Sequence, residues 1–321
     1  MTTPLPPLRL RRPIEGISAV LLPFTARGEI DFAGWETLCE RTWQAGLAPA
    51  VNMDTGYANL LTPEQRGDLL ARAGKLARGR RFIAGAFIVD RNGDATDLYL
   101  AEIAAIRAAG GTPILFQSPA LKALGREKMV ALYRRVAAEA GELLAFELGE
   151  MFAPFGAIYD LETVRALMEI PELKGMKHSS LSRELEWQRL ALRDEVRPDF
   201  KLYTGNDLAI DMVQWGSDYL LGLSAFYPEA FAVRDACWAA GRPEFYELND
   251  WLQYLGMLAF RAPVPAYKHT CAQTLRLRGI IASSEPHPRA ARRPDSDEAI
   301  LQQIVEKLDQ LTAAARAALA N

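Results

Sequence analysis

The stretch ISAVLLPFTARGEIDFAGWETLCERTWQAGLAPAVNM, residues 17–53, contains the pattern that decides the fold. The β-rich run ISAVLL (17–22) is followed by a helix-like segment, 29–46, in which Asp31 is the expected N-cap. A second strand-like run, APAVNM (48–53), follows after a short connection. Because strands joined through a helix run parallel when they share a sheet, this stretch predicts one strand–helix–strand unit.

The same strand–helix pattern recurs along the chain up to residue 241. Further strand-like runs are expected over residues 81–88, 112–116, 143–148, 173–177, 201–205 and 218–224. Helix-like segments accompany them over residues 61–77, 94–110, 125–141, 160–170, 183–195, 206–216 and 228–241. Eight such repeats are the number that closes a barrel, and no GxGxxG motif of an open dinucleotide-binding sheet follows the first strand. We therefore predict an α/β protein with the (β/α)8 TIM-barrel fold.

We expect three regions along the chain. They are an N-terminal extension over residues 1–15, the barrel over residues 16–241, and a C-terminal helical region over residues 242–321. Only helical patterns follow residue 242, so this last region is expected to form a helical appendix packed on the barrel. The polar, proline-rich segment 283–297 is expected to be a loop within it.

The composition excludes several classes of function. The 321 residues carry 37 basic and 40 acidic side chains, a net charge of −3, so nothing favours nucleic acid or an anionic membrane as a partner. The N-terminus lacks the apolar core of a secretion signal, and no apolar run reaches membrane-spanning length. Cys39, Cys237 and Cys271 stand far apart, as is typical of cysteines in a reducing compartment. We expect a cytoplasmic protein that acts on a small molecule.

Candidate site residues gather at one rim of the predicted barrel. Reactive groups in this fold lie at the C-terminal ends of the strands and in the loops that follow. The candidates there are Asp54, Thr55, Gly56, Tyr57, Glu147, Glu150, Lys177, His178, Ser179, Thr204, Asn206, Asp207 and Ser224. Their convergence predicts an active or binding site at this rim.

Lys177, in LKGMKHSS (173–180), is the candidate nucleophile. Burial in an apolar barrel mouth disfavours the charged ammonium and so makes the amine reactive. A neutral amine can condense with a substrate carbonyl to a Schiff base, which then acts as an electron sink. The alternative is a lysine paired with a carboxylate, for which Asp207 and Glu147 are candidates. Position alone does not decide between the two.

The proton-shuttling group is less clearly marked. Period-2 alternation points either Phe146 or Glu147 into the barrel, and we expect Glu147 inside because an unpaired carboxylate under the helices is costly. There it serves as a general acid/base or as an ion-pair partner of Lys177. Tyr57 either caps the barrel mouth or supplies a phenol to this site or to a neighbouring subunit's site. His178 is expected to point toward the helix layer and to be a packing residue.

Several segments together resemble the dihydrodipicolinate synthase / N-acetylneuraminate lyase family of class I aldolases. GISAVLLPFTARGEIDFAGWETL resembles its first strand and helix, and NMDTGYANLLTPEQR stands at its Gly-Thr-Thr-Gly-Glu loop. LKGMKHSS matches the segment of its Schiff-base lysine, and TGNDLAIDMVQWGSDYLLGLSAFYPEAF matches its Gly-Asp-Asp and Gly-x-x-Gly-x-Ser strands. The resemblance covers roughly residues 14–280. It implies a barrel in which Lys177 binds a 2-oxo acid without any cofactor, and a homodimer or homotetramer.

The chain also departs from the pattern of this family at several positions. Thr55 and Gly56 match loop residues that bind the substrate carboxylate, whereas Asp54 replaces the first threonine and Tyr57 the glutamate. An ionised Asp54 would repel a carboxylate, so the binding mode is expected to differ. LLAFEL lacks the family's proton-shuttling tyrosine, and MFAPFGAIY lacks the arginine with which the synthases hold their second substrate. The chain is therefore not expected to be a dihydrodipicolinate synthase itself.

We therefore expect a lyase, either a Schiff-base aldolase or a related dehydratase, that acts on a 2-oxo acid or sugar-acid-like substrate without cofactor or metal. Its expected catalytic residues are Lys177, Glu147 and Tyr57, and its expected substrate-binding residues are Asp54, Thr55, Gly56, Asn206 and Ser224. Two alternatives stay open. One is a TIM-barrel enzyme that forms no imine and uses carboxylates, with or without a divalent cation. The other is a ligand-binding barrel that has lost the chemistry.

Overall fold

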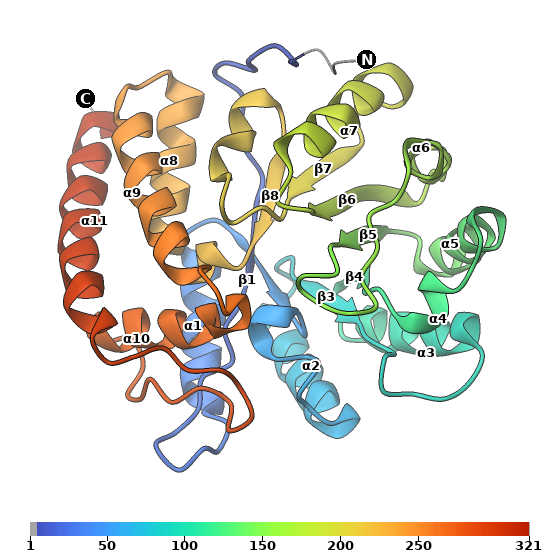
Figure 1. Ribbon diagram of the computed structural model, residues 1–321, viewed down its shortest axis with the longest axis horizontal. Helices are drawn as coiled ribbons and strands as arrows, with labels where there is room; N and C mark the ends of the chain where they lie inside the picture. The colour runs from blue at the N-terminus through green and yellow to red at the C-terminus, as the bar shows by residue number, and fades with distance from the viewer. Residues whose placement is uncertain (1–4, 321) are drawn as a thin grey trace.

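Eight parallel strands form a closed barrel at the centre of the molecule, in the order β1 to β8 (Figure 1). The computed structural model describes residues 5–320. The strands are β1 (Gly16–Ala19), β2 (Ala48–Val51), β3 (Ile83–Ala86), β4 (Thr112–Leu115), β5 (Leu143–Leu148), β6 (Leu173–Ser179), β7 (Lys201–Thr204) and β8 (Asp218–Leu221). The predicted TIM barrel is thereby confirmed, with β8 pairing to β1 to close the sheet.

The outer layer consists of helices that follow the strands. They are α1 (Phe32–Gln44), α2 (Pro63–Ala77), α3 (Ala95–Ala108), α5 (Arg126–Ala140), α6 (Leu161–Met168), α7 (Arg183–Val196) and α8 (Pro228–Ala240). Asp31 caps α1 by accepting a hydrogen bond from the Gly34 backbone N–H at 2.9 Å. Thr62 and Gln65 form a capping box at the start of α2. The capping signals in the sequence therefore set both helix starts.

Two segments differ from the prediction. A short helix, α4 (Pro119–Lys122), lies between β4 and α5, and the helix expected over 206–216 is only the 3-10 helix η2 (Ile210–Trp215). At the start of that segment, the Asn206 side chain accepts a hydrogen bond from the Leu208 N–H at 3.0 Å. The Gln253 side chain accepts one from the Ile210 N–H at 3.0 Å. These side chains satisfy backbone N–H groups at the start of the segment.

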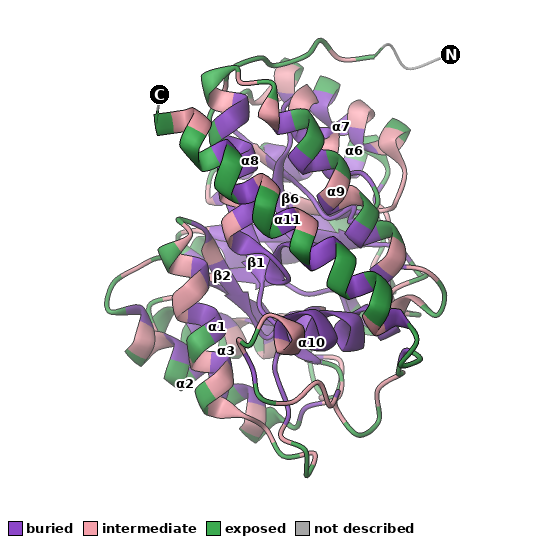
Figure 2. Cartoon of the chain, turned by 90° about the vertical axis from the view of Figure 1, so that its left-hand side faces the viewer, coloured by how far each residue is buried: buried purple, intermediate pink, exposed green. Residues whose placement is uncertain are grey.

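The C-terminal part of the chain is helical and packs beside the barrel. It contains α9 (Glu244–Ala259), the 3-10 helix η4 (Val264–Ala266), α10 (Tyr267–Leu277) and α11 (Asp297–Ala320). Helix α11 packs against α8 and α9, while α10 is almost wholly buried (Figure 2). Buried polar side chains of α10 find partners elsewhere in the protein in several cases, as when Lys268 donates to Asp54 and His269 accepts from the Arg293 N–H. None of the helices within residues 5–320 combines the length and apolar character that crossing a bilayer requires.

The strand register sorts the residues near the catalytic rim into two faces. Phe146 pairs with Lys177, which pairs with Tyr203, and in the next row Glu147 pairs with His178, which pairs with Thr204. Paired residues of a parallel sheet point to the same side, and successive rows alternate. The first row belongs to the barrel interior, which is filled by Ile17, Ala50, Ile83, Ile114, Phe146, Tyr203 and Leu220. The second row therefore faces the helices.

Candidate active site

Lys177 lies near the C-terminal end of β6 with its amine in the barrel mouth. The Nζ atom stands 4.6 Å from the centroid of the Phe146 ring. A Cβ atom at Gly205 would lie only 2.7 Å from the Lys177 Cε atom, so the missing side chain of Gly205 leaves room for the lysine stem. No carboxylate of the described residues forms an ion pair with this amine.

The environment of Lys177 favours the neutral amine. Burial lowers the pKa of Lys177 to about 8, although the charges of Asp207 and Asp54 oppose this shift. Desolvation therefore outweighs two nearby carboxylates. A lysine with these properties is a nucleophile candidate, because a useful fraction of it is unprotonated near neutral pH.

Asp207, in the loop after β7, is one of the two carboxyl groups whose charges act on Lys177. Its Oδ1 atom accepts a hydrogen bond from the Leu223 N–H at 2.7 Å. Burial raises the pKa of Asp207 to about 7, against the opposing effects of the Leu223 N–H and of Lys177. The two groups therefore both change protonation state in the neutral range. This coupling makes Asp207 an acid/base candidate.

A second group of polar side chains links the loop after β2 to helix α10. The Tyr267 hydroxyl donates to the Asp54 Oδ2 atom at 2.8 Å and lies 2.9 Å from the Thr55 Oγ1 atom. Lys268 Nζ donates to the Asp54 Oδ1 atom at 2.8 Å. Since the Tyr267 proton goes to Asp54, the Thr55 hydroxyl donates to the Tyr267 oxygen. We call this hydrogen-bonded chain of Lys268, Asp54, Tyr267 and Thr55 the α10 chain.

The α10 chain fixes the charge of its members. Burial alone would raise the pKa of Asp54, but the charge of Lys268 and hydrogen bonds from Lys268 and Tyr267, together with the Lys177 charge, hold it below its usual value. Burial, followed by the Asp54 charge, raises the pKa of Tyr267 well above its usual range. Asp54 is therefore an anion neutralised by Lys268, and Tyr267 keeps its phenolic proton. The expected repulsion between Asp54 and a substrate carboxylate is reduced accordingly.

The expectation that Glu147 points into the barrel is wrong. Its side chain is fully buried under the helices, where Arg189 of α7 donates to its two oxygens at 2.5 and 3.0 Å. His178 Nδ1 lies 2.5 Å from the Glu147 Oε1 atom, and the Tyr159 N–H donates at 2.9 Å. Burial would raise the pKa of Glu147, but His178 and Arg189 lower it to about 2. The carboxylate is paired there, and Phe146 takes the inward position.

Tyr57 follows the 3-10 helix η1 (Asp54–Gly56) and packs away from the inner cluster of the barrel. Its ring lies 5.6 Å from Phe24 and 5.7 Å from His287 between centroids. The Lys268 Nζ atom lies 5.3 Å from the ring centroid. Burial raises the pKa of Tyr57 above its usual range. The surroundings of Tyr57 favour the interpretation in which this residue caps the site and holds Lys268.

The remaining predicted substrate-binding residues have local roles. The Ser224 hydroxyl is buried and donates to the Leu221 carbonyl at 3.0 Å. Asn206 shapes the turn after β7, and Gly56 belongs to η1. The structure thus brings Asp54 close enough for its charge to act on Lys177, with Thr55 beside Tyr267, whereas the side chains of Asn206 and Ser224 bond to backbone groups of their own segments.

Sequence reasoning missed Tyr267 and Lys268. Both lie in a helix assigned to the appendix, more than 200 residues from the Asp54 loop. The available signal was a lysine within a stretch, YKHTCAQTL, that lacks any acidic partner of its own. His178, by contrast, was predicted correctly: it points to the helix layer and packs against Glu147.

The four carboxylates of the predicted rim, Asp54, Glu147, Glu150 and Asp207, do not all come together. Glu147 lies under the helices, and Glu150 pairs with Lys122 at 2.5 Å. Within residues 5–320, no group of three or more His, Cys, Asp or Glu side chains is arranged to hold a metal ion.

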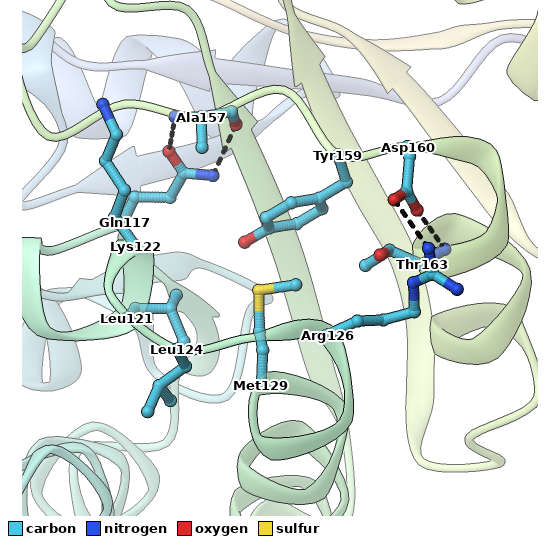
Figure 3. A pocket seen from close by; sticks show the side chains of 10 residues that line it. All are labelled: Gln117, Leu121, Lys122, Leu124, Arg126, Met129, Ala157, Tyr159, Asp160 and Thr163. Carbon is cyan, nitrogen blue, oxygen red and sulfur yellow. Dashed lines mark hydrogen bonds and ion pairs between the residues drawn. The ribbon is translucent and has the colours of Figure 1, made fainter.

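Two cavities flank the loop that joins β5 to α6. One, of about 80 Å³, lies at the barrel mouth between Asp54 and loop residues 152–155. The other, of about 220 Å³, lies on the opposite side of the loop, among α4, α5 and residues 157–163 (Figure 3). Only the first adjoins the α10 chain, so only this cavity belongs to the candidate site.

Comparisons with known proteins agree with the fold. A family model described as "Protein of unknown function (DUF993)" matches residues 19–285. A 4-hydroxy-tetrahydrodipicolinate synthase of Limosilactobacillus fermentum is 29% identical over 268 residues, covering 81% of this chain and 82% of that protein. The enzyme of the same description from Stenotrophomonas maltophilia is 28% identical over 239 residues, covering 73% of this chain and 76% of that protein.

Solved structures give the same picture. The dihydrodipicolinate synthase of Thermotoga maritima aligns over 93% of this chain and 99% of its own length, with a TM-score of 0.77 at 18% identity. An E. coli prophage protein of the dihydrodipicolinic acid synthase family, solved in complex with pyruvate, aligns over 92% of this chain and 98% of its own length, with a TM-score of 0.77 at 16% identity. At these identities the likeness concerns the fold.

Proposed function

Because this chain belongs to the DUF993 family and is a divergent member of the dihydrodipicolinate synthase / N-acetylneuraminate lyase family, we propose that it is a Schiff-base lyase that makes or breaks a carbon–carbon bond next to a 2-oxo acid. The observation that carries this proposal is Lys177, a barrel-mouth lysine whose pKa is lowered to about 8 by burial. A group with that pKa is about one tenth neutral at pH 7, whereas an ordinary lysine is roughly 0.03% neutral.

The proposed reaction begins with the Lys177 amine. Its nitrogen attacks the carbonyl carbon of the 2-oxo acid, and water leaves as the imine forms. Loss of a proton from the neighbouring carbon gives an enamine, which attacks the carbonyl carbon of an aldehyde, and the new alkoxide takes up a proton. Hydrolysis of the imine releases the product and restores the amine. In the reverse direction the same steps cleave the carbon–carbon bond.

The α10 chain is the proposed proton relay in place of Glu147. Thr55 ends the chain, and its hydroxyl can pass a proton to a substrate oxygen while taking one from Tyr267. The proton that Tyr267 gives up is replaced from the Lys268 ammonium through the Asp54 carboxylate, to which both Tyr267 and Lys268 donate. Asp207, with a pKa near 7, is the proposed group that takes the proton from the substrate carbon. This division of roles needs no tyrosine in β5.

A second function is favoured by one observation. The charges of Asp207 and Asp54 both act to keep Lys177 protonated. A charged Lys177 would bind a substrate oxyanion and leave the chemistry to Asp207 without forming an imine. The two functions differ in whether the lysine becomes covalently attached to substrate.

Reductive trapping tests the proposal. The protein is incubated with a panel of 2-oxo acids that includes pyruvate, treated with sodium borohydride, and analysed by intact mass and peptide mapping. We expect an adduct on Lys177 that is lost in Lys177→Met. Lys174→Met is the matched control, because Lys174 lies in the same strand but is exposed on the outer face. No adduct with any 2-oxo acid would refute the imine and favour the second function.

We also propose that the chain forms a homo-oligomer. Helix α9 exposes three large side chains with apolar surface, Tyr246, Tyr254 and Met257. Light scattering on the full chain tests this, and a monomer at micromolar concentration would contradict it.

A further inference from the structure

The apolar cavity beside Asp54 has the position of a second-substrate site. Its walls come from Asp54 and Asn59 on one side, from Phe116 and Leu148 at the ends of β4 and β5, and from loop residues 152–155. Lys177 does not line this cavity, but Phe116 of its wall packs against Phe146, the ring that the Lys177 amine contacts. The Phe116 and Phe146 centroids lie 5.2 Å apart, and the Lys177 Nζ atom lies 4.6 Å from the Phe146 centroid.

The cavity offers little to a polar ligand. Its two polar wall residues are Asp54 and Asn59, and both Asp54 oxygens already accept hydrogen bonds from Tyr267 and Lys268. The loop GEMFAPFGAIY (149–159) contains no lysine, arginine or histidine. Apart from the Asn59 amide, a carboxylate or a row of hydroxyl groups placed there would lose its water without gaining partners. An apolar group, in contrast, would bury its surface against phenyl rings.

The loop that closes the cavity is held in place. Gln117 donates to the Ala157 carbonyl at 2.7 Å and accepts from the Ala157 N–H at 2.6 Å (Figure 3). Lys122 donates to the Pro154 carbonyl at 3.2 Å. A Cβ atom at Gly156 would lie 2.9 Å from the Gly149 carbonyl oxygen, so the tight return of the loop depends on this glycine. The apolar wall is therefore a built part of the site.

The size of the cavity limits the group it can hold. A cavity of roughly 150 Å³ lined by apolar side chains accepts benzene. The cavity here is about 80 Å³, close to half of that. We infer that the carbonyl partner joined to the Lys177-bound 2-oxo acid is an aldehyde with a short aliphatic side chain of about three to five carbons. This inference rests on the proposed function and adds the chemical class of the second substrate.

Two aldehydes with the same number of non-hydrogen atoms separate the possibilities. 3-Methylbutanal has an aliphatic side chain, and glyceraldehyde has a hydroxylated one. Each is condensed with the 2-oxo acid that borohydride trapping identifies, and kcat/KM is measured from product formation. We expect 3-methylbutanal to be preferred by at least about tenfold, as apolar pockets discriminate on this scale. A kcat/KM for glyceraldehyde that equals or exceeds that for 3-methylbutanal overturns the inference. The Schiff base on Lys177, which trapping with the 2-oxo acid tests separately, is unaffected by that result.

Variants of the loop assign the preference to this cavity. Phe152→Ser should reduce the preference for 3-methylbutanal about fivefold or more, while Phe152→Leu should keep it. Met151→Ser is the matched control, because Met151 is exposed in the same loop and does not line the cavity. The rate of Lys177 trapping should be unchanged in all three variants. A preference that survives Phe152→Ser would overturn the inference, whereas loss of trapping in the unmodified protein would refute the proposed function and this inference with it.

Discussion

The reactivity of Lys177 should follow a pH profile that an ordinary lysine does not show. Imine formation needs the neutral amine, and burial lowers the pKa of Lys177 to about 8. The neutral fraction is then about 1% at pH 6, about 10% at pH 7 and about 50% at pH 8. At pH 7 this is roughly 300 times the neutral fraction of a lysine whose pKa is 10.5.

The assay is the rate of adduct formation with a 2-oxo acid in the presence of cyanoborohydride, followed by intact mass from pH 5.5 to 10. We expect the rate to rise about tenfold from pH 6 to pH 7 and to reach half of its plateau near pH 8. A rate that still rises tenfold per unit between pH 9 and pH 10 would refute the argument that burial outweighs the carboxylates.

Asp207→Asn tests the same argument from the other side, because it should lower the pKa of Lys177 further. The Asp207 charge raises the pKa of Lys177, so removing it should move the midpoint of the profile to lower pH. Trapping at pH 6.5 should then be faster than in the unmodified protein, even though turnover falls because the proposed base is lost. A midpoint that stays in place or moves to higher pH would mean that Asp207 does not act on the Lys177 amine.

Three further predictions concern the surroundings of Lys177. Gly205→Ala should slow trapping by at least about tenfold at unchanged fold, measured by mass and circular dichroism, because its Cβ would collide with the Ser179 Oγ atom and lie 2.7 Å from the Lys177 Cε atom. Tyr267→Phe should keep trapping but lower turnover by about 10²–10⁴-fold in steady-state assays, since the relay to substrate oxygen is broken. Arg189→Met should reduce the free energy of unfolding by about 3–5 kcal/mol at pH 7 in urea titrations, because the buried Glu147 carboxylate loses its guanidinium partner and keeps only its contacts with His178 and the Tyr159 N–H. That loss should shrink as the pH is lowered, since protonation removes the charge.

The fold followed from local patterns in the sequence. Each strand is a short apolar run, and several helices carry their own caps, as Asp31 and Thr62 illustrate. The structure departs from the prediction where a residue distant in the sequence contacts the segment. In the segment after Gly205, the 3-10 helix η2 begins at Ile210, whose backbone N–H donates to Gln253, a residue 43 positions further along the chain.

The site could be predicted only in part, for the same physical reason. Lys177 was visible because a lysine at the end of an apolar strand is unusual. The orientation of Glu147 could not be predicted from the sequence, because its partner Arg189 lies in a helix 42 residues further along the chain. Tyr267 is 213 residues from Asp54, and only the docking of α10 on the barrel brings their side chains together. Sequence patterns show which residue types are unusual at their positions. Contacts between distant segments, which those patterns do not show, decide what the residues do.

The most direct test of the central claim is hydrogen–deuterium exchange at the carbon next to the substrate carbonyl. Pyruvate, or the 2-oxo acid found by trapping, is incubated with the full chain in deuterated buffer, and its methyl or methylene signal is followed by proton NMR. We expect catalysed loss of the signal, because the Lys177 imine interconverts with its enamine. The exchange should vanish in Lys177→Met and persist in Lys174→Met. Exchange that survives Lys177→Met, or a protein that exchanges no 2-oxo acid, would contradict the account.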